Sequence, residues 1–139
     1  MPQELPIKIE AFIYRMTDAS LEYLLLKRVP EDGGFWQPVT GTLEFEESLR
    51  ECILREISEE TGIDSIISLT SEVHRFSWQK QDYTVVELVY GINVMATQTV
   101  SLSKEHDDYK WVHYEEAQNL LNKENNRIAL TKLHHLLNP

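Results

Sequence analysis

The chain has 139 residues and a formal net charge of −10, and hydrophobic and charged residues make up 42% and 26% of it. This length and composition predict one globular domain over residues 1–139, and the acidity disfavours DNA or long RNA as partners, because both require clustered Lys and Arg. No apolar run approaches the roughly 20 residues of a membrane span, and the N-terminal MPQELPIKIE lacks a signal-peptide pattern. We therefore expect a cytoplasmic monomer or homodimer without a membrane partner.

The first predicted elements are two strands that form a hairpin. Residues Pro6 to Arg15 alternate apolar and polar side chains, and the more apolar Leu21 to Arg28 follows a turn at residues 18–20. Turn-forming residues then predict a loop over Val29 to Gly34. The aromatic segment Phe35 to Val39 is predicted to be extended.

The next predicted element is a helix at roughly Glu46 to Thr61. Leu49, Cys52 and Ile57 recur at helical spacing, and Gly62 follows as a residue suited to the left-handed conformation that ends a helix. Because Cys52 is the single cysteine, an internal disulfide is excluded, and its place on the apolar side of this helix predicts a buried thiol.

The second half of the chain is predicted to add three strands and two closing helices. These are Ile66 to Trp78, Tyr83 to Met95 and Tyr109 to His113 as strands, and Glu115 to Leu121 and Asn126 to Leu137 as helices. Trp78, at the end of the first of these strands, is expected to lie in the core. The order of elements predicts an α/β fold in which a mixed sheet carries helices on both faces.

The stretch from Gly41 to Ile63 is unusually acidic for a helix that only packs. Its seven acidic residues are Glu44, Glu46, Glu47, Glu51, Glu56, Glu59 and Glu60. At about 100° per residue, Glu56, Glu59 and Glu60 share one arc beside the apolar face, whereas Glu47 and Glu51 are expected on the opposite, solvated side. Like charges at this spacing repel by roughly 0.2–0.5 kcal/mol per pair. Arg55 can relieve part of that repulsion, but one guanidinium does not neutralise three acids.

A divalent cation is the natural counter-charge for the three inner acids. Oxygen ligands select Mg²⁺, or Mn²⁺ in its place, over Zn²⁺, and no His or Cys set stands nearby at ligand spacing. An acidic protein can also accept a small phosphorylated substrate when such a metal stands between carboxylates and phosphates. The residues alone thus indicate metal-assisted hydrolysis of a phosphate ester or anhydride, and a solvated acidic helix is the alternative.

The same residues resemble the Nudix box, G-x5-E-x7-R-E-U-x-E-E-x-G-U, in which U is a bulky aliphatic residue. The matching positions are Gly41, Glu47, Arg55, Glu56, Ile57, Glu59, Glu60, Gly62 and Ile63. Many members carry Gly-Gly at the start and Gly before the first Glu, whereas this chain has Thr40-Gly41 and Glu46, a difference that bears on loop shape. The resemblance implies the Nudix α/β/α sandwich, with a mixed sheet and the box as a loop and helix.

The flanking residues resemble two branches of this family. The segments concerned are Phe35 to Gly41, the Glu105-His106 pair with Tyr109 and Trp111, and Asn126-Arg127. They are similar to the dihydroneopterin triphosphate pyrophosphatases, and the diadenosine tetraphosphate hydrolases share a tryptophan-containing lead-in and a Glu-His pair. The resemblance implies a Mg²⁺-dependent hydrolase of phosphoanhydride bonds that converts a small triphosphate, dihydroneopterin triphosphate or a (d)NTP, to the monophosphate and pyrophosphate. Dinucleoside polyphosphate hydrolysis is the alternative, and a non-catalytic ligand-sensing domain is more remote because the box carboxylates are all present.

The resemblance also implies roles for the acidic residues and their arginine. Glu56 and Glu60 would be metal ligands, with Glu59 beside them as a ligand or the base. Glu105 would complete the metal site or act as the general base, and Arg55 would orient the box carboxylates.

Five further positions are implied in substrate binding. Arg28 would contact the phosphate chain, and Trp36 would stack on the substrate's ring or instead pack at the rim of the core. The backbone near Thr40 and Gly41 would approach the metal and the phosphates. His106 would contact the substrate near the phosphates or instead lie on the surface.

Overall fold

The structure is a computed structural model that describes residues 4–18 and 20–138. Within these ranges eight strands form one sheet, and their bounds are β1 Glu4–Met16, β2 Leu21–Arg28, β3 Trp36–Gln37, β4 Val39–Glu44, β5 Ser68–Leu69, β6 His74–Lys80, β7 Tyr83–Asn93 and β8 His106–Val112. The helices are α1 Leu49–Thr61, α2 Tyr114–Leu120 and α3 Glu124–Leu137, with a short 3₁₀ turn, η1, at Pro30–Asp32. The predicted turn at residues 18–20 includes Ala19, which lies outside the described residues.

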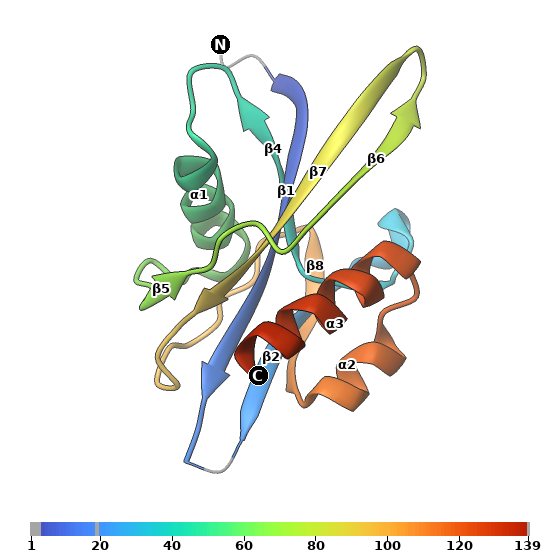
Figure 1. The fold of residues 1–139 in the computed structure, drawn as a ribbon. Coiled ribbons are helices and arrows are strands. Elements are labelled where there is room, and N and C mark those ends of the chain that lie inside the picture. The colour runs from blue at the N-terminus through green and yellow to red at the C-terminus, as the bar shows by residue number, and fades with distance from the viewer. Residues whose placement is uncertain (1–3, 19, 139) are drawn as a thin grey trace.

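The two longest strands form the centre of the sheet (Figure 1). Strands β1 and β7 are parallel to each other from Ile7 to Tyr14, while the other pairings are antiparallel. On its other edge, β1 pairs with β4 near its start and with β2 near its end, so the sheet divides there. The end of α1 lies against the loop before β8, where the Ser101 amide bonds the Thr61 carbonyl.

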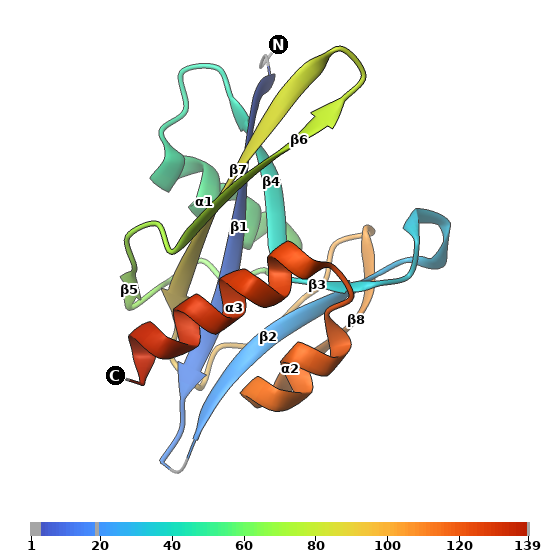
Figure 2. The same cartoon turned by 45° about the vertical axis from the view of Figure 1, so that its right-hand side comes forward.

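Helices cover both faces of this mixed sheet, as the order of elements predicted (Figures 1 and 2). On one face α1 packs Ile53 and Ile57 against Ile9 and Ile13 of β1. On the opposite face α2 and α3 pack against the alternate β1 positions, such as Phe12. Each fully buried aliphatic side chain of this size stabilises the fold by about 1.5–3 kcal/mol. None of the helices in the described ranges is long and apolar enough to cross a membrane.

The helix α1 begins at Leu49, three residues after the predicted start. Ser48 accepts a hydrogen bond from the Glu51 amide while the Glu51 side chain accepts from the Ser48 amide, a capping box that fixes where the helix begins. Before the cap, Glu46 adopts a φ of 67°, the left-handed conformation that the usual glycine of the box would take more easily. Gly62 ends the helix with a φ of 74°, as predicted.

The predicted strand over Ile66 to Trp78 was wrong in its extent. It divides into β5 and β6, which pair with different parts of β7, and between them single amides of Thr70 and Val73 bond to β7 carbonyls. Trp78 is also not a core residue, because it lies on β6 beside a cavity described below.

Candidate metal and substrate site

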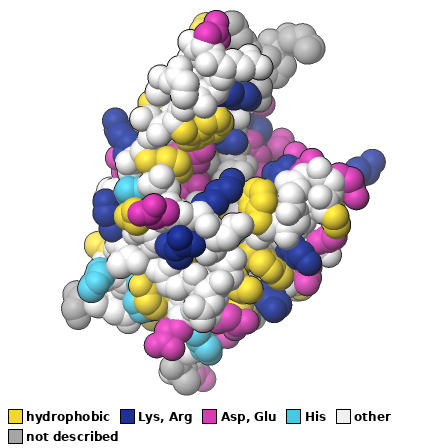
Figure 3. Space-filling view, turned by 90° about the vertical axis from the view of Figure 1, so that its right-hand side faces the viewer, with side chains coloured by type: hydrophobic (Ala, Val, Ile, Leu, Met, Phe, Trp, Pro, Cys, Tyr) yellow, Lys and Arg dark blue, Asp and Glu magenta, His cyan; other side chains and the backbone are white. Residues whose placement is uncertain are grey.

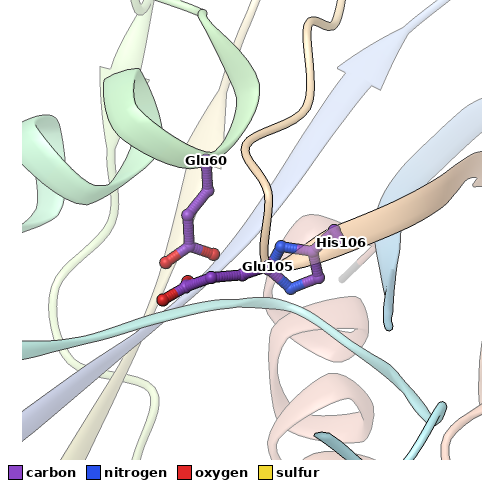
Figure 4. A group of neighbouring side chains, drawn as sticks. All are labelled: Glu60, Glu105 and His106. Atoms are coloured by element: carbon purple, nitrogen blue, oxygen red, sulfur yellow. The ribbon is translucent and has the colours of Figure 1, made fainter. Parts of the chain in front are cut away.

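Three side chains from two separate segments meet at the end of α1 (Figure 4). Glu60 lies in the last turn of α1, while Glu105 and His106 come from the loop that leads into β8. One potential ligand atom from each residue lies within 4.8 Å of the others. The structure thus brings a box carboxylate and the predicted outside carboxylate together, although they are far apart in sequence.

Glu60 is the most deeply buried acid of the box, with 3% of its surface exposed. Burial, the most important cause, and then the charges of Glu56 and Glu105 raise the pKa of Glu60 to about 9, while a backbone hydrogen bond from Thr40 lowers it. Its Oε1 atom is buried and accepts no hydrogen bond from any residue in the described ranges. A buried oxygen without a donor, among other acids, is the environment that a cation relieves.

Glu56 lies beside Glu60 on the inner side of α1 and packs directly on β4. A Cβ atom built on Gly41 would lie 2.0 Å from the Glu56 carboxyl carbon, so only glycine leaves room for this carboxyl. Burial raises the pKa of Glu56, Arg55 lowers it, and Glu59 raises it. The requirement for Gly41 is therefore steric and concerns the position of Glu56 rather than the backbone conformation of β4.

Arg55 organises the outer side of this acidic cluster. Its Nε and Nη2 atoms donate to the two carboxylate oxygens of Glu47 at 2.7 and 3.0 Å, and Nη2 also donates to the Thr42 carbonyl at 3.0 Å. Its Nη1 atom donates to Glu56 at 3.2 Å and approaches Glu59 at 3.5 Å. These contacts fit the predicted orienting role of Arg55.

The expectation that Glu47 belongs to a solvated outer set was wrong. Glu47 precedes α1 and folds back onto Arg55, which leaves 13% of its side chain exposed and holds its pKa below the usual value. Helical geometry does not apply to a residue in the turn before the helix, and the prediction had placed Glu47 inside it. Glu59 is the exposed member of the three inner acids, with 58% of its side chain in contact with solvent.

His106 is buried and neutral rather than a surface residue. Burial, followed by the charge of Arg28, lowers the pKa of its imidazole. Its Nε2 atom lies 3.0 Å from the side-chain nitrogen of Gln37. Because an amide NH₂ group can only donate, Nε2 must accept, and the ring proton is then on Nδ1. His106 therefore directs an N–H donor, suited to an anion rather than to a metal ion, toward the cluster.

A cavity of about 480 Å³ adjoins the acidic cluster, and Figure 3 shows this face hollowed, with basic and acidic side chains around the hollow. Arg28 and Thr40, two of the predicted substrate contacts, line it, as does Gln37, the partner of His106. Trp36 is not among the described residues that line it, and its ring packs against the core on the α2 and α3 side. The neighbouring Phe35 faces the cavity instead.

Several residues that line this cavity were not predicted from the sequence. Its lining includes Glu10, Glu87, Trp78 and Asn126, none of which was assigned a role in function. One signal was available, because Glu87 is a charged residue inside the otherwise apolar run VVELVY of the central strand β7. For Glu10 no signal stood out, since alternation in β1 allows a polar residue at that position.

Comparison with known proteins places these features in a family. Residues 6–133 match the NUDIX domain. The chain belongs to the Nudix family. The resemblance seen in the box is thereby confirmed, and so is the expected enzyme class, a Nudix hydrolase acting on phosphoanhydride bonds.

Relatives of this Nudix chain carry several names. The asymmetrical bis(5'-nucleosyl)-tetraphosphatase of Mus musculus is 32% identical over 133 residues, which cover 90% of this chain and 86% of that protein. The dihydroneopterin triphosphate diphosphatase of Haemophilus influenzae is 27% identical over 121 residues, covering 78% and 76%. An octanoyltransferase of Myxococcus xanthus is 37% identical over 93 residues, but this chain spans only 26% of that protein's length.

Solved structures agree with the predicted α/β fold. A Nudix hydrolase from Listeria monocytogenes has a TM-score of 0.83 at 29% identity, covering 96% of this chain and 95% of its own. The C. elegans Ap4A hydrolase in a binary complex has a TM-score of 0.80 at 23% identity, covering 95% and 97%, which supports likeness of fold alone.

Proposed function

We propose that this protein is a Mg²⁺-dependent Nudix pyrophosphohydrolase that converts a small nucleoside-like triphosphate to the monophosphate and pyrophosphate. Dihydroneopterin triphosphate and the (d)NTPs are the leading substrates. The observation that carries the proposal is the junction of the acidic cluster with the 480 Å³ cavity, which is formed by Gln37 and Thr40. A pocket of this size suits a nucleotide, because small-molecule sites span roughly 300–1,000 Å³.

The residues of the cluster fit a magnesium or manganese ion. Glu60, Glu56 and Glu105 offer hard oxygen donors, and the buried Oε1 of Glu60 accepts no hydrogen bond from the described residues. A bound Mg²⁺ would polarise the phosphate and lower the pKa of an attacking water. Its charge would also offset the repulsion that raises the pKa of Glu60.

Other residues of the chain would position the substrate and move the proton. Arg28, at the cavity wall, would contact the phosphate chain, and the Nδ1–H of His106 would donate to a phosphate oxygen. Water attacks one phosphorus, a bridging P–O bond breaks, and the water's proton passes to a carboxylate. Glu59 and Glu105 are the candidates for this base because both are exposed to solvent water, whereas Glu60 is buried.

A second candidate is the hydrolysis of a dinucleoside tetraphosphate. It is supported by the 32% identity to the murine bis(5'-nucleosyl)-tetraphosphatase. A ligand sensor without activity is disfavoured, since the chain keeps every box carboxylate. The cytoplasmic location, the monomeric or dimeric state, and the absence of DNA, long RNA and membrane partners stay predictions from the sequence.

A substrate panel with product analysis tests the proposal. The purified protein is incubated with dihydroneopterin triphosphate, the (d)NTPs and diadenosine tetraphosphate in ¹⁸O-water with millimolar Mg²⁺, and the products are identified by phosphorus NMR. We expect pyrophosphate and a monophosphate, with ¹⁸O marking the attacked phosphorus, and complete loss of turnover in excess EDTA. Full turnover in EDTA would refute the metal assignment, and hydrolysis of the dinucleotide alone would favour the second candidate.

A further inference from the structure

Two buried acids line the cavity on the face of the sheet opposite α1. Glu10 of β1 and Glu87 of the neighbouring strand β7 are 3% and 8% exposed, and both line the cavity. Buried carboxyls contribute little to packing and are costly unless hydrogen-bonded. Their place in the two central strands therefore calls for a functional explanation.

The hydrogen bonds around this pair come from donors on three elements. Asn126, near the start of α3, donates its Nδ2 to Glu10 Oε1 at 2.7 Å, and Trp78 of β6 donates its Nε1 to Glu87 Oε1 at 2.6 Å. The second oxygen of Glu10, Oε2, is buried and receives no donor from another residue in the described ranges.

The first acid of the pair, Glu10, favours its protonated form at neutral pH. Burial, and then the charge and hydrogen bonding of Glu87, raise the pKa of Glu10 to about 8, against smaller opposing effects of Asn126 and Lys123. A hydrogen bond between the two carboxyls leaves mainly acceptor oxygens toward the cavity, whose lining also includes Lys8 and Lys123.

Aromatic rings lie beside the carboxyl oxygens of Glu10 and Glu87 in the cavity wall. Phe35, Phe76 and Trp78 line the same cavity, and the ammonium of Lys123 lies 4.3 Å from the centre of the Phe35 ring. The bond from Trp78 to Glu87 fixes the indole next to the acid. A flat heterocycle can pack against these rings while its edge meets the acids.

We propose that Glu87, with Glu10 and Asn126 around it, binds the ring of the substrate and selects the 2-amino-4-oxo pyrimidine edge of guanine and pterins over adenine. The inference rests on the proposed function, because it takes the phosphate chain to lie beside Arg28 and the acidic cluster. Thr40 connects the two groups of acids, because it lies opposite Glu10 in the β1–β4 pairing and its backbone bonds Glu60. This edge carries a ring N–H next to an exocyclic NH₂, two parallel donors that a carboxylate accepts as it accepts an arginine fork.

Adenine offers a different edge to the same acids. It presents one NH₂ donor beside a ring nitrogen whose lone pair would face a carboxylate oxygen. The shared proton is held between Glu10 and Glu87 and does not serve that nitrogen. Sites built to hydrogen-bond a substrate group reject analogues that leave their polar atoms unpaired, and one bidentate pair is worth roughly 10- to 100-fold in discrimination.

The test compares kcat/KM for GTP, inosine triphosphate and ATP, which share one triphosphate chain. Inosine triphosphate keeps the ring N–H but lacks the 2-amino group, so it isolates one of the two donors without a mutation. The variants are Glu87→Gln, Glu10→Gln, and Glu72→Gln as the matched control, because Glu72 pairs with Arg75 on the surface outside the cavity. Circular dichroism and thermal melts establish that each variant is folded.

We expect the wild type to favour GTP over both other substrates by roughly tenfold or more. Glu87→Gln should lower the GTP-to-ATP ratio at least tenfold, and Glu10→Gln should lower it less, because its amide stands in for the protonated acid. Glu72→Gln should keep the ratio within threefold. A wild type that treats inosine triphosphate like GTP, or a folded Glu87→Gln variant with an unchanged ratio, would overturn the inference.

If the wild type hydrolyses no triphosphate, the proposed function fails and ring selection is measured by binding. Guanosine, inosine and adenosine are then titrated at millimolar concentration without metal, with tryptophan fluorescence as the signal because Trp78 borders the site. A response to guanosine that exceeds the other two and disappears in Glu87→Gln supports the inference. Equal responses, or none, contradict it.

Discussion

Replacing Gly41 by alanine should inactivate the enzyme while leaving its fold intact. Gly41 lies in β4 and has no positive φ, so alanine fits the backbone and the effect is confined to the added methyl group. That methyl would lie 2.0 Å from the Glu56 carboxyl carbon, whereas ordinary contact begins at 3.4 Å. The carboxyl must therefore move by about 1.4 Å, the difference between these distances, and a misplacement of roughly 1 Å at a reacting centre costs on the order of 100-fold in rate.

The assay is kcat at saturating substrate together with the Mg²⁺ concentration that gives half-maximal rate. We expect kcat to fall about 100-fold or more and the Mg²⁺ requirement to rise, with the melting temperature little changed. Gly91→Ala is the matched control, since its methyl would meet Leu133 Cδ1 at 2.5 Å in the core on the other face. Overpacking there should lower the melting temperature by roughly 3–10 °C and spare kcat below that temperature. A Gly41→Ala enzyme within threefold of wild type would refute the reasoning that glycine makes room for Glu56.

Two further predictions concern the buried acids. Glu60→Gln should reduce kcat by several orders of magnitude without unfolding the protein. The control Glu116→Gln, on the exposed side of α2, should leave kcat unchanged. A Glu60→Gln enzyme that retains more than about a tenth of the activity would contradict the metal-ligand role. The pKa of Glu10 rises on folding from its usual value of 4.5 to about 8, so its contribution to stability is complete below pH 4.5 and is lost as the pH rises toward 8. Urea unfolding without metal should therefore show a smaller loss of stability between pH 5 and pH 8 in Glu10→Gln than in the wild type; identical pH profiles would show that Glu10 is not the group concerned.

The sequence predicted those parts of the molecule in which local pattern and tertiary packing agree. The helix α1 was found because its apolar spacing, its acids and Gly62 all fit one element. The sheet was found because β1 alternates apolar and polar residues, while β2 and β7 are rich in apolar ones. Glu105 could be placed beside Glu60 only through the family resemblance, since no local pattern joins residues so far apart in the chain.

The predictions that were wrong or missing share one physical cause. Glu47 was misplaced because a capping turn, not a helix, determines where its side chain points. Trp78 was assigned to the core because an aromatic residue on a strand is usually packed, yet its indole N–H bonds Glu87 at a cavity wall. Glu10 and Glu87 meet through the parallel pairing of β1 and β7, whose register does not follow from either strand alone. In each case the contact is formed by tertiary structure, and it overrides the local preference.

In the proposed mode of binding, the two sets of buried acids would meet different parts of one substrate. Burial raises the pKa of Glu60, at the end of α1, and of Glu10, on the opposite face of the sheet. At the end of α1, several carboxylates lie beside His106, and a divalent cation would offset their negative charge before a phosphate approached. Beside β7, two carboxyls next to aromatic rings would accept hydrogen bonds from two N–H donors of a neutral ring. An acidic protein can thus bind an anionic substrate because neither set of carboxylates has to meet a phosphate directly.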